Sequence, residues 1–278
     1  MQTALLNEPR TYRYPTVRLV LLILLLVLLG TVPFMILGSM QSVYTLISWM
    51  FIGLIMVIAI YSLTRSTTIS NDGISSRTLF GERSLHWSEI DSVSGRGNGI
   101  KLHSRDGDTV VPSPQLPGYP EVIEIIGAKR PDLFNPTGGR AMTRNWFGSL
   151  LFLVIGAISV GAGLYLYFDP SETESPMPLI FLAVVALAFV MSIFTSVLAL
   201  DFEGPALTVR YLVGRTTLSP EEVRSVVFGV TQTRNGKSYN VHIFTTRGRT
   251  ISFSGIGPSL PIVYLVLKNW HQARALTL

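Results

Sequence analysis

Two stretches of sequence decide the fold: residues 79–93 read LFGERSLHWSEIDSV, and residues 212–226 read LVGRTTLSPEEVRSV. Aligned without a gap, they share the skeleton L-x-G-x-x-x-L-x-x-x-E-[IV]-x-S-V. Self-similarity at a fixed spacing is typical of a duplicated structural unit. The chain is therefore expected to contain the same module twice.

The repeat continues downstream of these stretches. Residues 102–110 match residues 243–251, and Pro120 matches Pro261. The offset between the copies rises from 133 to 141 residues, so the second copy is longer. We place its extra residues in the hairpin region 229–240.

Each copy is expected to form short strands followed by one helix. Turn sequences such as Asn71-Asp72-Gly73, Gly81-Glu82-Arg83 and Asp106-Gly107-Asp108 punctuate the first copy, and Asp-Gly is a strong hairpin signal. Strands are predicted at residues 67–70, 74–79, 84–86, 90–94, 100–104 and 109–112. After Pro120 and Pro261 the apolar spacing becomes helical, and proline suits a first helical turn.

Charge is distributed unevenly along the 278 residues. Only 14% of them are charged, against roughly 25% in an average soluble domain, and residues 19–64, 145–168 and 175–200 carry no charge. A bilayer core of about 30 Å requires roughly 20 apolar residues per helix. We therefore expect four transmembrane helices in two hairpins, at residues 19–37, 44–63, 147–168 and 179–200.

The Lys and Arg residues predict the orientation of these helices. All 22 lie in the N-terminal tail, in residues 65–144 or in residues 200–278, and positive residues stay on the cytoplasmic side. The expected protein is integral to the cytoplasmic (inner or plasma) membrane, with its N-terminus and both domains in the cytoplasm. The expected segments are a tail (1–18), a hairpin (19–64), a domain (65–135), a linker (136–146), a hairpin (147–200) and a domain (201–278).

Two hairpins, each followed by strands that carry this skeleton, resemble the bacterial PH-domain membrane proteins, which couple helical hairpins to PH-like domains. Residues 87–90, Trp-Ser-Glu-Ile, resemble that family's I-P-W-S-D-I turn, with His86 in place of its proline. The resemblance implies an α+β membrane protein in which each hairpin precedes a PH-like β-roll, a partly open barrel, with a C-terminal helix. It implies an interaction or scaffolding role and supplies no catalytic residues.

The sequence offers no constellation typical of catalysis or metal binding. It contains no cysteine, which excludes disulfides, thiolate nucleophiles and iron–sulfur clusters. There is no metal-ligand spacing among the histidines, no G-x-S-x-G elbow and no P-loop. The histidines are His86, His103, His242 and His271. We expect no enzyme activity, no metal and no cofactor.

Basic residues of the second copy are the candidate binding surface. Residues 65–144 have a net charge of +1, whereas residues 200–278 have +5. Four basic residues of the longer hairpin and the next turn are suited to an anionic leaflet or an acidic partner: Arg234, Lys237, Arg247 and Arg249. The alternative is that they are ordinary solvated charges on the positive side of the membrane.

Other partner classes are weighed by their chemistry. The loops Asn71-Asp72-Gly73 and Glu203-Gly204-Pro205 lack the basic cluster of phosphoinositide-binding PH domains, so we expect no specific phosphoinositide ligand. We do not expect nucleic acid as a partner either.

A pair of small residues in the third predicted span indicates close helix packing. Ala157 and Gly161 are four residues apart and suit either a homo-oligomer interface or packing within the chain.

The expected function is a membrane-anchored, non-enzymatic scaffold or adaptor. Two cytoplasmic PH-like domains would contact a protein partner and possibly the anionic surface of the lipid bilayer. The alternative is a small oligomeric channel or transporter subunit whose helices conduct and whose domains act as gates.

Overall fold

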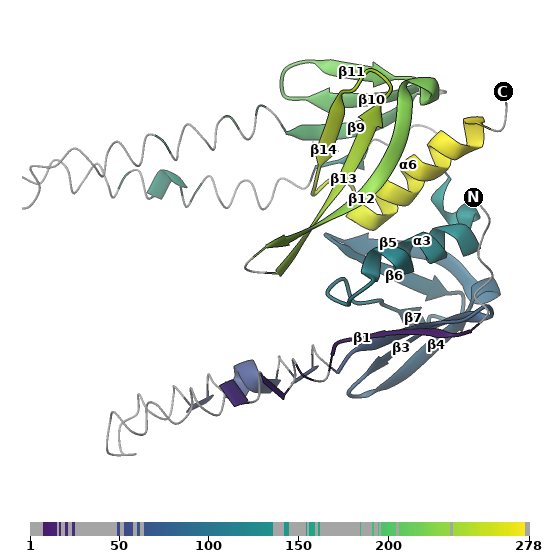
Figure 1. Cartoon of the computed structure of the whole chain (residues 1–278), viewed down its shortest axis with the longest axis vertical. Helices are drawn as coiled ribbons and strands as arrows, with labels where there is room; N and C mark the ends of the chain where they lie inside the picture. Colours follow the sequence, from purple (N-terminus) through teal and green to yellow (C-terminus); the bar gives the residue numbers. More distant parts are fainter. Residues whose placement is uncertain are drawn as a thin grey trace, which may run out of the picture. The chain divides into compact units, whose positions relative to one another are not determined.

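The computed structural model of the chain divides into two compact units (Figure 1). The first unit comprises residues 1–95 and 99–133, and the second comprises residues 96–98 and 134–278. The residues that the structure describes are 8–15, 17, 20–21, 24–25, 49–50, 53–57, 60–61, 64–135, 142–144, 154, 156–158, 161, 184, 191, 194, 196–203, 206–233 and 236–275.

The first unit contains two sheets and a helix. A four-stranded antiparallel sheet has the order β1-β2-β3-β4, and a three-stranded sheet has the order β5-β6-β7. The bounds are β1 Arg10–Arg13, β2 Ser66–Ile69, β3 Gly73–Thr78, β4 Gly81–His86, β5 Ile90–Arg96, β6 Gly99–Ser104 and β7 Thr109–Val110. The 3-10 helix η1 (Trp87–Glu89) joins the sheets, and α3 (Tyr119–Lys129) and η2 (Pro131–Phe134) follow them.

The second unit repeats this order of elements. Its four-stranded sheet has the order β11-β10-β9-β8, and its three-stranded sheet has the order β12-β13-β14. The bounds are β8 Met142–Thr143, β9 Val197–Glu203, β10 Ala206–Tyr211, β11 Arg215–Leu218, β12 Val223–Thr233, β13 Gly236–Thr245 and β14 Thr250–Phe253. The 3-10 helix η3 (Pro220–Glu222) joins the sheets, and α6 (Leu260–Ala275) ends the unit.

The predicted strands between residues 66 and 110 are confirmed to within two or three residues at each end. Alternating burial explains them, since β3 buries Ile74 and Ser76 while Ser75 and Arg77 are more exposed. The Asp106-Gly107-Asp108 turn is confirmed as well: Gly107 has a φ of 90°, and the Ser104 amide donates to the Asp108 carbonyl at 2.9 Å. Glycine is the residue that adopts this φ without strain.

The two cores differ in composition. The first is built from fully buried aliphatic side chains of both sheets and α3, among them Ile69, Ile74, Ile90, Ile100, Leu102, Ile123 and Ile126. The second contains an aromatic cluster in which the Phe228 ring lies 5.3 Å from the Tyr239 ring and 5.4 Å from the Tyr264 ring, measured between centroids. Both cores hold a helix against a sheet by burying apolar surface.

The prediction of an α+β membrane protein with four transmembrane helices is wrong. The described residues are mostly β-strand, in four sheets, and none of the helices among them is long and apolar enough to cross a membrane. The predicted localisation in the cytoplasmic membrane depended on those helices and falls with them. Most of residues 19–37, 44–63, 147–168 and 179–200 lie outside the described residues, which include scattered helical positions there and, at 197–200, the start of strand β9.

The end of the last predicted span shows the physical reason for the error. Residues 197–200 were included in a helix ending at residue 200, but they begin strand β9, in which Val197, Ala199 and Leu200 are buried. A short apolar run is compatible with a buried strand as well as with a helix, because lack of charge carries no periodicity. Absence of charge was therefore not evidence for helix at this position.

Two short strands were not predicted. β1 lies in the segment expected to be a tail, and β8 lies in the segment expected to be a linker. Each adds to the edge of a four-stranded sheet: Tyr12 is opposite Thr67, and Met142 is opposite Leu200. Strands of four and two residues are too short for a periodic signal, and their partners lie more than fifty residues away.

Candidate functional site

The hairpin between β3 and β4 ends in two exposed apolar side chains, Leu79 and Phe80, which we call the first tip. Thr78 is opposite Gly81, so these two residues form the whole loop. The side chain of Phe80 is 84% exposed and that of Leu79 is 56% exposed. The sequence predicted a turn at residues 81–83 instead, because it assigned Leu79 to a strand.

The hairpin between β10 and β11 has the same feature, Leu212 and Val213, which we call the second tip. The Tyr211 amide donates to the Gly214 carbonyl at 3.0 Å and closes the turn. Leu212 is 45% exposed and Val213 is 73% exposed. Two-residue hairpin loops favour Asn, Asp and Gly, whose backbones suit the turn. Turn geometry therefore does not explain apolar residues at either tip.

Charged residues flank both tips on the adjoining strands. In the first unit, Arg77 is opposite Glu82, an opposite-charge pair. In the second unit, Arg210 is opposite Arg215, a like-charge arrangement that is unfavourable by itself. Arg210 Nε lies 2.5 Å from Asp201 Oδ2, which offsets the repulsion. The second tip is thus the more basic of the two.

An aromatic contact supports the first tip. The Phe80 ring lies 5.8 Å from the Tyr61 ring, at an interplanar angle of 39°. The Arg65 guanidinium carbon lies 4.4 Å from the centroid of the same Tyr61 ring, within the range of a cation–π contact. Phe80 therefore has a defined neighbour while most of its surface stays accessible.

Of the four basic residues predicted to bind an anionic surface, the three that the structure describes are not gathered into one cluster. Arg234 lies outside the described residues. Lys237 is at the start of β13, opposite Gln232, whereas Arg247 and Arg249 follow the end of β13. At about 3.3 Å per residue the strand separates them by roughly 26 Å.

Arg247 and Arg249 share one turn but have different neighbours. Arg247 Nη2 lies 2.9 Å from Glu222 Oε1, so part of its charge is offset within the unit. Arg249 lies beside Tyr211, whose pKa is raised by burial and drawn in the opposite direction by this guanidinium. The anionic-surface role of these residues stays a prediction.

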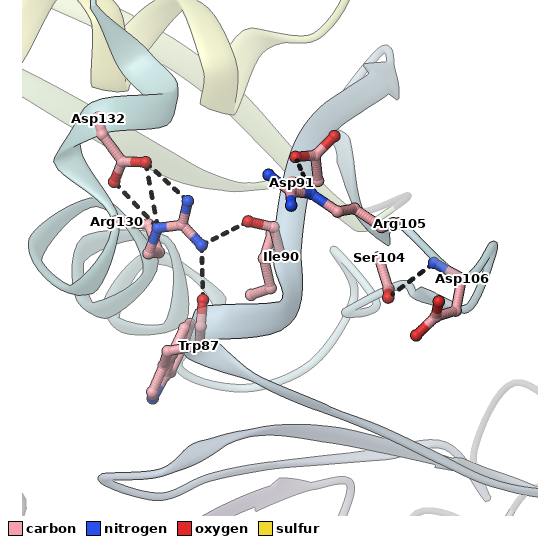
Figure 2. Close-up of polar contacts among 8 residues, drawn as sticks. All are labelled: Trp87, Ile90, Asp91, Ser104, Arg105, Asp106, Arg130 and Asp132. Carbon is pink, nitrogen blue, oxygen red and sulfur yellow. Dashed lines mark hydrogen bonds and ion pairs between the residues drawn. The ribbon is translucent and has the colours of Figure 1, made fainter.

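A polar clamp fixes the end of α3 in the first unit (Figure 2). Arg130 Nη1 donates to the carbonyl of Trp87 at 2.6 Å and also to that of Ile90. Arg130 Nη2 lies 2.7 Å from Asp132 Oδ2. The hydrogen bonds from Arg130 hold the pKa of Asp132 below its usual value. The clamp ties the helix to η1 and β5 and has a structural role.

One nucleophile–base pair was missed by the sequence analysis. Ser94 Oγ and His103 Nε2, on the neighbouring strands β5 and β6, share a hydrogen bond of 2.6 Å. The other ring nitrogen of His103 lies 3.2 Å from the Thr109 hydroxyl, whereas a catalytic triad places a carboxylate there. Among the described residues no group of His, Asp and Glu side chains is arranged to hold a metal ion.

No protein-family model matches the chain, and no curated protein matches it. The resemblance to the bacterial PH-domain membrane proteins therefore stays a prediction from the sequence skeleton.

Proposed function

We propose that this chain is a non-enzymatic adaptor in which each unit binds a protein partner through its apolar hairpin tip. The observation that carries the proposal is the repetition of the feature: both units expose two large apolar side chains at the same hairpin. The geometry of the two-residue hairpin turn does not require an apolar pair at either tip. A single exposed apolar side chain is ordinary, but an exposed apolar pair at the corresponding hairpin of both copies calls for a common reason.

The size of the tips suits the anchor of an interface. Binding energy is concentrated in a few side chains that fill a pocket on the partner, and aromatic residues are common among them. A Phe side chain buries about 150–250 Å² when it is enclosed. Phe80 would therefore be the dominant anchor of the first tip, and Val213 the smaller anchor of the second.

The flanking charges indicate the chemistry of the partner. Arg77 and the opposite Glu82 flank the first tip, whereas Arg210 and Arg215 flank the second. We expect both tips to enter an apolar pocket, with carboxylates on the rim of the pocket that receives the second tip. Such rim charges act mainly on association rate and specificity, so raised salt should slow binding at the second tip more than at the first.

Site-specific photocrosslinking tests the proposal on the full-length chain. A benzophenone amino acid is placed at position 80 or 213, with controls at the exposed positions Arg105 and Thr231. The expected result is a discrete crosslinked protein, identified by mass spectrometry, from the tip positions and not from the controls. Equal crosslinking at all four positions would overturn the proposal.

Affinity for the protein so identified gives the second measurement. Phe80→Ser should weaken binding at least 10-fold, since an interface anchor contributes about 2 kcal/mol or more and each 1.4 kcal/mol is tenfold. Arg105→Ala, a matched exposed change in the same unit, should leave affinity unchanged. The channel alternative required transmembrane helices, and no described helix is long and apolar enough to cross a membrane.

A further inference from the structure

A polar cavity of about 270 Å³ lies in the second unit, beside the first residues of β9. Its polar lining consists of Arg144, Ser196, Asn240, Ser252 and Ser254, and its apolar lining consists of Val197 and Phe253. These residues come from four places in the chain: the end of β8, the start of β9, the middle of β13 and the end of β14. None of them was singled out by the sequence analysis as a binding residue.

The backbone that holds Arg144 in place is well defined. Its amide donates to the Leu198 carbonyl at 2.8 Å, and the residue forms an antiparallel bridge with Ile256. The next turn is fixed too, since the Gly257 amide donates to the Thr143 carbonyl at 2.9 Å. Arg144 is thereby held between β9 and the segment that follows β14, at the wall of the cavity.

The lining has the composition of an oxyanion site. A guanidinium supplies a permanent positive charge and several N–H donors in a planar fork that fits carboxylate and phosphate groups. Serine hydroxyls and an asparagine amide add uncharged donors. Among the described residues that line the cavity there is no Asp or Glu that would repel an anion. The volume lies just below the roughly 300–1,000 Å³ of sites for drug-sized ligands, which favours a small ion or an end group.

We propose that this cavity binds a small oxyanion, either a phosphate or a carboxylate group, with Arg144 as its charged donor. The first copy does not share the polar lining of this cavity. In the repeat register, Asn240 corresponds to Gly99 and Ser252 corresponds to Val111. The first copy thus lacks two of the polar side chains that line the cavity in the second.

Methyl NMR on the full-length chain, labelled at valine methyl groups, tests the site because Val197 lines the cavity. Potassium phosphate and potassium acetate are titrated separately, with potassium chloride at equal ionic strength as the reference. If the Val197 methyl chemical shift changes and saturates as phosphate or acetate is added, the proposal is supported. The anion that produces saturation shows whether the site takes a phosphate, a carboxylate or both. Shifts that follow potassium chloride in both titrations overturn it.

The anion affinity of two single-residue variants shows whether binding depends on the cavity. Arg144→Gln should weaken binding about 10- to 100-fold, because hydrogen bonds to charged groups contribute about 1.5–3 kcal/mol. Arg224→Gln removes the same charge from an exposed position of β12 and should change the affinity less than twofold. Equal affinities of these two variants would overturn the proposal.

Two milder variants keep the test decisive if Arg144→Gln does not fold. Arg144→Lys retains the charge but loses the fork, and should bind more weakly than the wild type. Ser252→Ala removes one hydroxyl from an exposed strand position and should weaken binding about 2- to 10-fold. If both bind like the wild type, the cavity is not the site.

Discussion

The two units anchor the last turns of their C-terminal helices by different chemistry, although both helices bury an apolar face. In the repeat register, Lys129 at the end of α3 corresponds to Trp270 in α6. Lys129 Nζ lies 3.3 Å from the side-chain oxygen of Asn71. Trp270 is buried, with its ring 6.3 Å from that of Phe202 in a T-shaped arrangement.

The neighbouring positions extend the contrast. Arg130 of the first unit, which forms the clamp with Trp87, Ile90 and Asp132, corresponds to His271 of the second. The first helix ends in hydrogen bonds and ion pairs near the surface, whereas the second continues as a longer helix whose aromatic face is buried. The shared skeleton therefore specifies the order of the elements but not the contacts that anchor the end of each C-terminal helix.

Trp270→Ala should have the largest effect on the stability of either helix end. Truncating a buried tryptophan removes apolar burial and leaves a cavity, so the second unit should lose about 3–5 kcal/mol of unfolding free energy. Hydrogen exchange followed by mass spectrometry measures this unit by unit, since its peptides report local opening separately.

The matched change for Trp270→Ala is Lys129→Ala in the first unit. Its amine contacts an exposed asparagine, so a loss within about 0.5 kcal/mol is expected. Equal losses from the two substitutions would show that the two helix ends are anchored alike.

Arg130→Ala should have an intermediate effect, confined to the first unit. The substitution removes the donor to two backbone carbonyls and the partner of Asp132, which we expect to cost about 1–3 kcal/mol. Urea unfolding, with hydrogen exchange to locate the change, gives the measurement. Arg105→Ala is the control, because its 3.0 Å pair with Asp91 is exposed and exposed pairs contribute about 0–1 kcal/mol. A loss no larger than that of the control would contradict the role of the clamp.

The smallest expected effect is the pH dependence of the clamp. The folded-state pKa of Asp132 is lowered, first by its hydrogen bonds with Arg130. Its contribution is therefore complete above the unfolded pKa of about 3.9 and is lost as the pH falls through the lower, folded value. Because the carboxylate is largely exposed, solvent screening limits this to roughly 0.5 kcal/mol.

Asp132→Asn separates this contribution from the rest of the acid response. The wild type should be the more stable at pH 6, and the gap should narrow towards pH 3 when both proteins are unfolded by urea. A gap that is constant with pH would mean that the carboxylate's charge does not stabilise the clamp.

Much of the fold near the turns was predictable from residues alone. Asp106-Gly107-Asp108 forms the expected tight turn, and both helices begin beside the predicted prolines, Pro120 and Pro261. Glycine and proline act through their own backbone restrictions, which do not depend on distant neighbours.

Features created by distant neighbours were not predictable. β1 exists because β2 offers it an edge, and Ser94 meets His103 only because β5 and β6 pair. The tips were missed for a different reason: Leu79 and Phe80 have the composition of a strand, and only the register of β3 with β4 places them in the loop. A glycine two residues after Leu79, and again two residues after Leu212, was the available signal.

Residues alone predicted the duplicated skeleton, the strands between residues 66 and 110, the Asp106-Gly107-Asp108 turn and a helix at the end of each copy. Those properties follow from local backbone preferences and from self-similarity, which a single chain displays. The folded structure was needed to show which apolar residues are exposed at the tips, which polar residues line the cavity at Arg144, and that apolar residues 197–200 begin a strand. Each of these depends on strand pairing and burial between residues far apart in the chain, and such contacts leave no periodic trace in the sequence.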